Sequence, residues 1–155
     1  MPQDTEKPPP ELELHWELPR GWAQTRSRAQ ASVTAQGPVA LARRPRLTGT
    51  LEQVDDPLTG WWDGLTEVFP QALEDYRLLD AGEALVAGLG GVRRLLHYSR
   101  AGQPTLMEQW AAQDAGLRIV VLATLPPRSY DALADVLVAV VAGARVAPTA
   151  QGTPR

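Results

Sequence analysis

The chain contains no cysteine. Disulfide bonds, thiol catalysis, thiolate zinc sites and lipid attachment through a cysteine are therefore excluded for this sequence. Histidine is scarce too, since His15 and His97 are the only two. A metal site would need more ligands converging on one of them, and general-base catalysis would need a neighbouring nucleophile. We therefore expect structural or surface roles for both histidines, and neither a metal site nor a cofactor.

Long apolar segments and targeting signals are also missing. The longest apolar run, Val136–Ala144, is far shorter than the roughly 20 residues that a membrane-spanning helix needs. The N-terminus places acidic residues and prolines where a secretory signal peptide has basic residues followed by an apolar stretch. These observations predict a cytoplasmic protein without a membrane span.

The chain carries no excess of positive charge, because its formal net charge is −3. Non-specific nucleic-acid binding requires a basic face that displaces counterions. Arginines do gather in the first third of the chain, at Arg26, Arg28, Arg43, Arg44 and Arg46. Solvated positions on strands explain them more simply than a nucleic-acid site does. We therefore expect no nucleic-acid partner.

Motifs for catalysis are weak throughout. The segment Gly88-Leu89-Gly90-Gly91 resembles a phosphate-binding loop, but it leads into an expected strand instead of a helix, and no Gly-Lys-Ser/Thr follows it. A tight turn is the better interpretation. Ser129 lacks the flanking glycines of a nucleophile elbow, and the pair Asp55-Asp56 is typical of a helix cap. The sequence therefore predicts a protein that is not an enzyme.

The composition divides the chain into one domain with two tails. Residues 1–10 and 147–155 are polar or rich in proline and glycine, so they are expected to be flexible. Residues 11–146 are enough for one domain with a substantial core. Its first half looks rich in strands. Leu12, Leu14 and Trp16 alternate with polar residues as in a half-buried strand, shorter candidates are 31–34 and 39–44, and 48–54 is ambiguous.

Two amphipathic helices are predicted. The first covers 58–69, where large apolar residues share one helical face; Asp55 or Asp56 would cap it and Pro70 would end or kink it, with 71–75 as a possible further turn. The second begins at Tyr130 after Ser129, with an apolar stripe that continues to Ala144. Large side chains on such faces contribute about 1.5–3 kcal/mol each when they are fully buried.

The region 88–145 predicts three consecutive strands closed by the second helix. The strands 92–99, 106–113 and 117–125 are separated by short spacers that contain glycine, and another strand is expected around 83–87. Such short spacers join antiparallel neighbours, since a parallel crossover needs a dozen or more residues. Trp22 and Trp110 suit either the core or a binding surface.

These elements resemble the DcrB-like branch of the Mog/PsbP-like fold. The matching segments are Leu18-Pro19-Arg20-Gly21-Trp22, the helix 58–69, Tyr76-Arg77-Leu78-Leu79, Leu89-Gly90-Gly91, the strand 92–98, Met107-Glu108-Gln109-Trp110, the strand 117–124 and the helix from Tyr130. Together they cover about residues 12–145. The resemblance implies an α+β protein in which helices pack on the faces of a curved antiparallel sheet, an α/β/α sandwich without an active site.

The functional expectation follows from the missing chemistry and from this resemblance. One similar branch, the Eag chaperones of type VI secretion, forms dimers that shelter hydrophobic effector helices. We therefore expect a non-enzymatic cytoplasmic adaptor or chaperone of a secretion-type system, which binds hydrophobic segments of another protein on a sheet face or edge. A homodimer is compatible with this hypothesis. The predicted contact residues are Trp22, Met107, Trp110, Ile119 and Val121. A structural subunit of a phage-tail-like or secretion assembly is the main alternative; a small-molecule carrier and an enzyme are the others.

Overall fold

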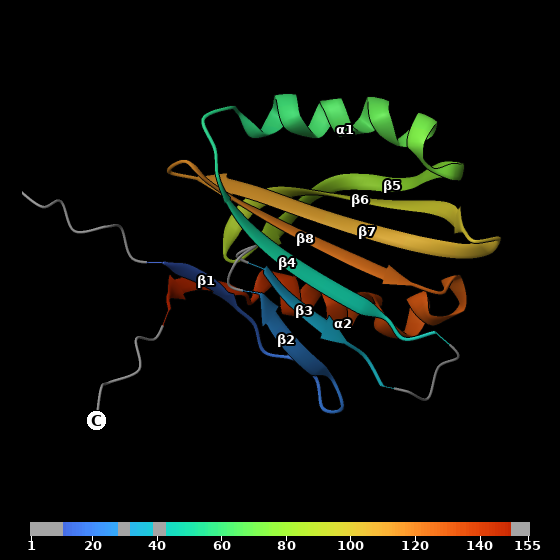
Figure 1. Cartoon of the computed structure of the whole chain (residues 1–155), viewed down its shortest axis with the longest axis horizontal. Coiled ribbons are helices and arrows are strands. Elements are labelled where there is room, and N and C mark those ends of the chain that lie inside the picture. The colour runs from blue at the N-terminus through green and yellow to red at the C-terminus, as the bar shows by residue number, and fades with distance from the viewer. Residues whose placement is uncertain (1–10, 28–31, 39–42, 150–155) are drawn as a thin grey trace, which may run out of the picture.

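The computed structural model describes residues 11–27, 32–38 and 43–149. Its centre is a seven-stranded sheet whose neighbouring strands are all antiparallel, with the order β2-β3-β4-β8-β7-β6-β5. Helix α1 lies above this sheet in Figure 1, and helix α2 lies on the opposite side. A separate pair, β1 with β9, joins the two ends of the described chain. The expected α+β class and the antiparallel sheet with two helices are confirmed.

The strands and helices have the following bounds: β1 Leu12–His15, β2 Ala23–Ser27, β3 Ser32–Gln36, β4 Arg46–Gln53, α1 Leu58–Ala72, β5 Glu74–Val86, β6 Leu89–Arg100, β7 Gln103–Asp114, β8 Leu117–Leu125, α2 Tyr130–Ala142 and β9 Arg145–Pro148. A short 3₁₀ turn, Pro127–Ser129, precedes α2.

The three consecutive hairpins that join β5, β6, β7 and β8 share the same type of two-residue turn. Each is closed by an Ala-Gly pair with positive φ at both residues: 51° and 75° at Ala87-Gly88, 50° and 75° at Ala101-Gly102, and 48° and 76° at Ala115-Gly116. Positive φ at both central residues matches the twist of antiparallel strands in a two-residue hairpin. The expected antiparallel order of β6, β7 and β8 is therefore confirmed. The turn expected over Gly88–Gly91 is shorter, because Gly90 and Gly91 already belong to β6.

The core occupies the sheet face that carries α2. Side chains alternate between the two faces of a strand; Trp110, Val121 and Leu47 therefore point into this core from three adjacent strands, with 1%, 0% and 0% of their surface exposed. Leu137 and Val141 of α2 cover them. On the same face, β1 crosses β4 at Gly49, where Leu14 and Trp16 occupy the space that a Cβ atom would need.

The opposite face is held to α1 by arginine. None of the 15 residues of α1 is fully buried. Instead, the buried guanidinium of Arg94 lies 3.7 Å from the ring centre of Trp62 and donates hydrogen bonds to Thr66 Oγ1 and Gln109 Oε1. Stacking of this kind on a desolvated cation contributes about 2 kcal/mol.

Arg118 makes a second contact of the same kind near the start of the helix. Its Cζ lies 4.5 Å from the ring centre of Trp61, and its Nη2 donates to the carbonyl oxygen of Asp56 at 3.3 Å. Burial lowers the pKa of Arg94 to about 10, which still leaves that guanidinium charged at neutral pH. Two cations thus hold α1 alongside the buried apolar residues of this sheet face, Leu96, Ala111 and Val120.

Several expected boundaries were wrong. Helix α1 continues through Pro70 to Ala72; the proline leaves only the Thr66 carbonyl without a donor, near an exposed end of the helix. Pro57, and not Asp55 or Asp56, is the N-cap residue, and no side chain caps the helix. Residues 147 and 148, expected in the tail, belong to β9.

Parts of other expectations lie outside the described residues. These are residues 1–10, 150–155, Ala31 and 39–42. Of the strand expected over 39–44, the described Arg43 and Arg44 are not in a strand, whereas the ambiguous segment 48–54 is largely β4.

The neighbouring glycines Gly90 and Gly91 test the packing between β6 and β7. A Cβ atom at Gly91 would lie 2.4 Å from the carbonyl oxygen of Ala111. Gly91→Ala is therefore expected to lower the free energy of unfolding by about 1–3 kcal/mol, because backbone must shift to accept the methyl group. Gly90→Ala is the matched control, since no heavy atom lies within 4 Å of its added Cβ. Urea unfolding measures both, and equal stability of the two variants would contradict the packing described.

A second pair of variants tests how α1 is attached. Arg94→Gln removes the cation that stacks on Trp62, so the amides of α1 are expected to exchange with solvent at least tenfold faster. Arg77→Gln changes an exposed arginine of the adjacent β5 and is expected to leave the exchange unchanged. Hydrogen exchange followed by mass spectrometry reads both out. Unchanged protection of α1 in Arg94→Gln would mean that the stacked cation does not hold the helix.

Candidate functional site

The two edges of the large sheet differ in length. The edge strand β2 has 5 residues, whereas the edge strand β5 has 13. Short edge strands protect a sheet against unwanted pairing, and long ones offer a row of unpaired backbone N–H and C=O groups. In Figure 1, β5 forms the upper edge of the sheet, beside α1. Among the described strands, β5 is therefore the main place where another chain could extend the sheet.

The two halves of β5 have different local geometry. Its pairing with β6 shifts register between Glu74 and Arg77 and again between Leu78 and Asp80. Such bulges twist a strand edge and hinder pairing. From Asp80 to Val86, however, every residue pairs in regular succession with β6. This regular half is therefore the part of the edge that can accept a further strand.

Large apolar side chains are exposed along this strand. Leu78, Leu79 and Leu85 expose 48%, 51% and 59% of their surface, and Val68 of the adjoining α1 exposes 53%. We call these four residues together with the regular segment Asp80–Val86 the β5 edge surface. Leu78 pairs with Leu96 and Leu85 with Gly90. Because these two partners are six residues apart on β6, both leucines lie on the sheet face that carries α1.

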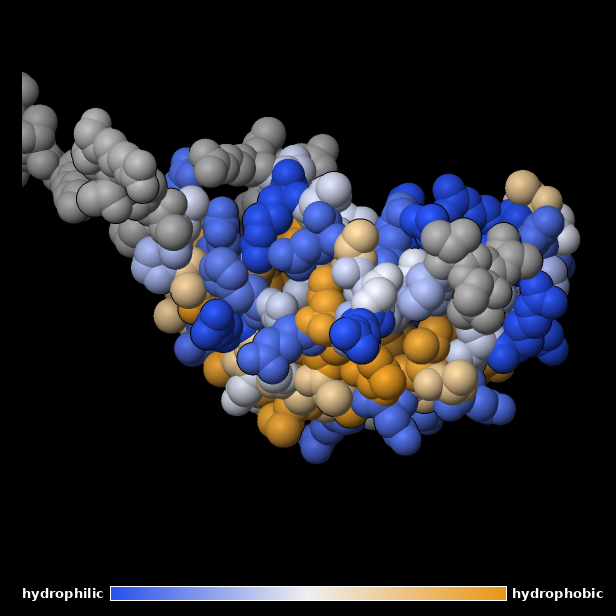
Figure 2. Space-filling model, turned by 90° about the horizontal axis from the view of Figure 1, so that it is seen from below, coloured by the Kyte–Doolittle hydropathy of each residue, from blue (hydrophilic) through white to orange (hydrophobic). Residues whose placement is uncertain are grey.

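A second apolar area lies on the other side of the molecule. Viewed from below, hydrophobic residues gather on the face where α2 lies and are interrupted by hydrophilic ones (Figure 2). Among the large exposed hydrophobic side chains, Val138 belongs to α2, with 48% of its surface exposed. Asp131 and Asp135 lie on the same helix. Among the described residues, this area has fewer exposed large apolar side chains than the β5 edge surface.

An ionic chain fixes β5 to the interior from the α2 side. Arg93 donates to Asp80 Oδ2 at 2.8 Å and to Glu108 Oε1 at 3.4 Å, and Tyr130 donates to Glu108 Oε2 at 2.8 Å. The hydrogen bond from Arg93 lowers the pKa of Asp80. Burial raises the pKa of Tyr130, as does its bond to Glu108. The buried Glu108 carboxylate is thus compensated on both oxygens, which gives this cluster a structural role.

Three of the predicted contact residues are buried. Trp110, Ile119 and Val121 expose 1%, 2% and 0% of their surface. The alternation of β7 and β8 turns them toward the core beneath α2, where Trp110 and Val121 are direct cross-strand partners. Their assignment to a protein-binding surface was therefore wrong. The structure brings these three together, but as part of the hydrophobic core.

The other two predicted residues are partly exposed but lie apart. Trp22 packs against the core cluster. Met107 lies between its cross-strand partners Leu96 and Thr124, on the sheet face that carries α1. The sequence analysis missed the leucines of β5, although the pair Leu78-Leu79 in an extended segment was visible. What it lacked was the information that this segment is at an edge.

The two histidines, considered as possible catalytic or metal-binding residues, each make one or two polar contacts. His15 lies 3.6 Å from a carboxylate oxygen of Glu13, and His97 Nδ1 lies 3.3 Å from the carbonyl oxygen of Asp75. In the part of the chain that the structure describes, no three histidine, cysteine or acidic residues gather as metal ligands. Within the same ranges, no helix has the length and apolarity that crossing a bilayer requires.

Comparison with known proteins shows similarity in structure only. No protein-family model matches the sequence, and no curated protein matches it. Among solved structures, LpqN of Mycobacterium tuberculosis, which is involved in cell envelope biogenesis, superposes with a TM-score of 0.67 at 13% identity, over 90% of this chain and 86% of that one.

Two further structures are similar. Cyanobacterial PsbP (CyanoP) of Synechocystis sp. PCC 6803 has a TM-score of 0.57 at 13% identity, over 88% of this chain and 92% of that one. The type VI secretion immunity protein TplEi of Pseudomonas aeruginosa has a TM-score of 0.53 at 21% identity, over 77% of this chain and 44% of that one. These likenesses agree with a PsbP/Mog-like fold, and no family match supports the DcrB-like branch within it.

Proposed function

We propose that this chain is a non-enzymatic protein-binding module that takes up an extended apolar segment of another protein along the β5 edge surface. The observation that carries the proposal is the regular segment Asp80–Val86, which pairs with β6 on one side and has no neighbouring strand among the described residues on the other. Leu85 within it is 59% exposed, and the Ala81 N–H already donates to Asp80 Oδ1 at 3.0 Å. A strand added to such an edge gains main-chain hydrogen bonds, and side chains on alternate positions supply specificity.

The exposed leucines define the chemistry of the segment. A partner strand beside Asp80–Val86 would place every second side chain on the α1 side of the sheet, where Leu78 and Leu85 lie. Each large apolar side chain that becomes buried contributes up to about 1.5–3 kcal/mol. The proposed partner is therefore an apolar or amphipathic stretch in extended conformation.

The structural neighbours are compatible with a role in protein interaction. One of them is an immunity protein of a type VI secretion system, and another is involved in cell envelope biogenesis. These neighbours support only a part in protein interaction. Within that, we propose the finer role of an adaptor or chaperone of a secretion-type system in the cytoplasm. The contact surface, however, moves from the predicted Trp110, Ile119 and Val121 to the β5 edge surface, and Met107 and Trp22 are at most peripheral to it.

Site-specific photo-crosslinking tests this proposal. A photoreactive amino acid at position 85 is expected to form an adduct with a partner protein in the native host, whereas the same amino acid at the exposed position 52 of β4 is not. The double variant Leu79→Lys/Leu85→Lys is expected to lower the yield of co-purified partner at least tenfold, because lysines on an edge oppose strand addition. Both leucines are exposed, so the free energy of unfolding should change by no more than about 0.5 kcal/mol per site.

Two results would count against the proposal. Equal adducts from positions 52 and 85 would mean that the contact is not specific to the edge. Partner recovery that is insensitive to the two lysines would place the partner elsewhere on the molecule. An adduct with twice the mass of this chain would show that a second copy occupies the edge, which would replace the proposed heterologous partner with a homodimer.

A further inference from the structure

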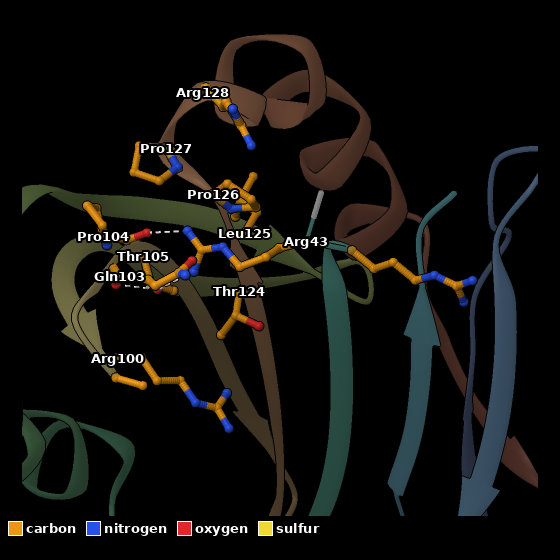
Figure 3. Close-up of a pocket in the computed structure, with 12 residues that line it drawn as sticks. Arg43, Arg100, Gln103, Pro104, Thr105, Thr124, Leu125, Pro126, Pro127 and Arg128 are labelled. Carbon is orange, nitrogen blue, oxygen red and sulfur yellow. Dashed lines mark hydrogen bonds between the residues drawn. The ribbon is translucent and has the colours of Figure 1, made fainter. Parts of the chain in front are cut away.

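A groove lined by four arginines lies at the end of the sheet where the β6–β7 hairpin meets the last residues of β8. It has a volume of about 780 Å³, and the arginines are Arg43, Arg44, Arg100 and Arg128. We call it the arginine groove. Figure 3 shows Arg128 above the guanidinium of Arg43 and Arg100 below it. These side chains come from three separate segments of the chain, which only the fold brings together.

One arginine of the groove is held in place. Arg43 donates to the Thr105 hydroxyl oxygen at 3.1 Å and to the carbonyl oxygen of Pro104 at 2.6 Å. Thr105, which accepts one of these hydrogen bonds, is buried, with 5% of its surface exposed. Neither acceptor carries a formal charge, so the positive charge of Arg43 is positioned without being neutralised. Prepositioned cations bind an anion at a lower entropic cost than free surface side chains do.

Among the residues that the structure describes, no acidic side chain lines the groove. The remaining lining residues are neutral: Ala101, Gln103, Pro104, Thr105, Thr124, Leu125, Pro126 and Pro127. Among the described residues, the ion pairs of this chain involve Arg26, Arg93 and Arg118 and none of the groove arginines. Arg44 donates to Gln36 Oε1 at 3.5 Å, and Gln36 is not a lining residue. Arg43, Arg100 and Arg128 therefore give the groove a local excess of three positive charges on a chain whose net charge is −3. An anionic ligand would supply the missing counter-charge.

The walls of the groove indicate which anion fits. Pro104, Leu125, Pro126 and Pro127 make much of the lining apolar, and no aromatic side chain is present in it. Nucleic-acid strands and nucleotides are usually held by stacking on aromatic side chains, and the net negative charge of the chain opposes a polyanion. Guanidinium groups bind carboxylates through paired hydrogen bonds. A peptide that alternates acidic and apolar residues matches both the cations and the apolar walls.

We propose that the arginine groove binds an acidic peptide segment of a protein partner, with its carboxylates on Arg43, Arg100 and Arg128. This inference rests on the proposed function in one respect, namely that the ligand belongs to a protein partner. It uses a surface separate from Asp80–Val86, and it can therefore hold or fail independently of the β5 edge surface.

A labelled nine-residue peptide that alternates glutamate with valine is the probe, and fluorescence anisotropy measures its affinity for the full chain. Wild-type protein is expected to bind it, with an affinity that falls when the salt concentration rises. The double variant Arg100→Glu/Arg128→Glu is expected to bind at least tenfold more weakly. The matched control is Arg77→Glu/Arg145→Glu, which changes the net charge equally at two exposed arginines outside the groove and should keep wild-type affinity within about twofold.

Further measurements in the same assay decide which ligand the arginine groove recognises. Equal loss in the control variant would show a general charge effect and overturn the proposal. Tighter binding of a single-stranded oligonucleotide than of the peptide would also overturn it, because the ligand would then be a phosphate polymer. The variant Leu79→Lys/Leu85→Lys is expected to bind the acidic peptide normally, so a failure at the β5 edge is distinguishable from a failure at the groove.

Discussion

The stacking of two buried arginines under α1 is the contact on which the arrangement of this molecule depends. The sheet has two faces with different kinds of packing. One face is sealed by α2 and β1 with aliphatic side chains and Trp110. The other carries Arg94 and Arg118, each 2% exposed, so a purely apolar helix could not lie on it without leaving two cations unsatisfied. Trp61 and Trp62 solve this by presenting ring faces to the guanidinium groups.

This mode of attachment has a consequence for the edge of the sheet. A helix held at two stacking points does not need to bury its whole apolar face, and Val68 and Leu65 of α1 are accordingly not fully buried. The two helices each cover a face of the sheet. Residues 80–83 and Leu85 of the edge strand β5 are exposed, while hydrogen bonds from Arg93 to Asp80 and Glu108 tie this strand to the interior.

Sequence patterns predicted both helices and the three hairpin strands, but they did not predict β2, β9 or the exposed surfaces. Alternation and the Ala-Gly spacers gave β6, β7 and β8, and helical periodicity gave α1 and α2, because these signals are local. Helix α1 continues beyond Phe69 to Ala72, because Pro70 is tolerated in an exposed last turn. A period-2 pattern shows that Trp110, Ile119 and Val121 share one face with their partners, but it does not show that α2 covers that face.

The same limit applies to the position of β5 and to the arginines. The place of β5 at the edge follows from the order of all the strands, which no short pattern contains. Arg43 and Arg44 were visible as a cluster in the sequence and were interpreted as solvated strand positions. Only the fold brings Arg100 and Arg128, more than fifty residues away in the sequence, to the groove that Arg43 also lines.

Both proposed contact surfaces are connected through β6, which pairs along the whole regular part of β5 and ends in Arg100. Six residues separate Asp80 from Glu74, which is about 20 Å in a strand. A partner strand along the edge would therefore need a linker of roughly ten residues to place an acidic segment in the arginine groove. Contacts made together in this way raise the effective concentration of the second segment. Salt separates the two contributions, since it screens the exposed charges of the groove and leaves the backbone pairing and leucine burial at the edge largely unchanged.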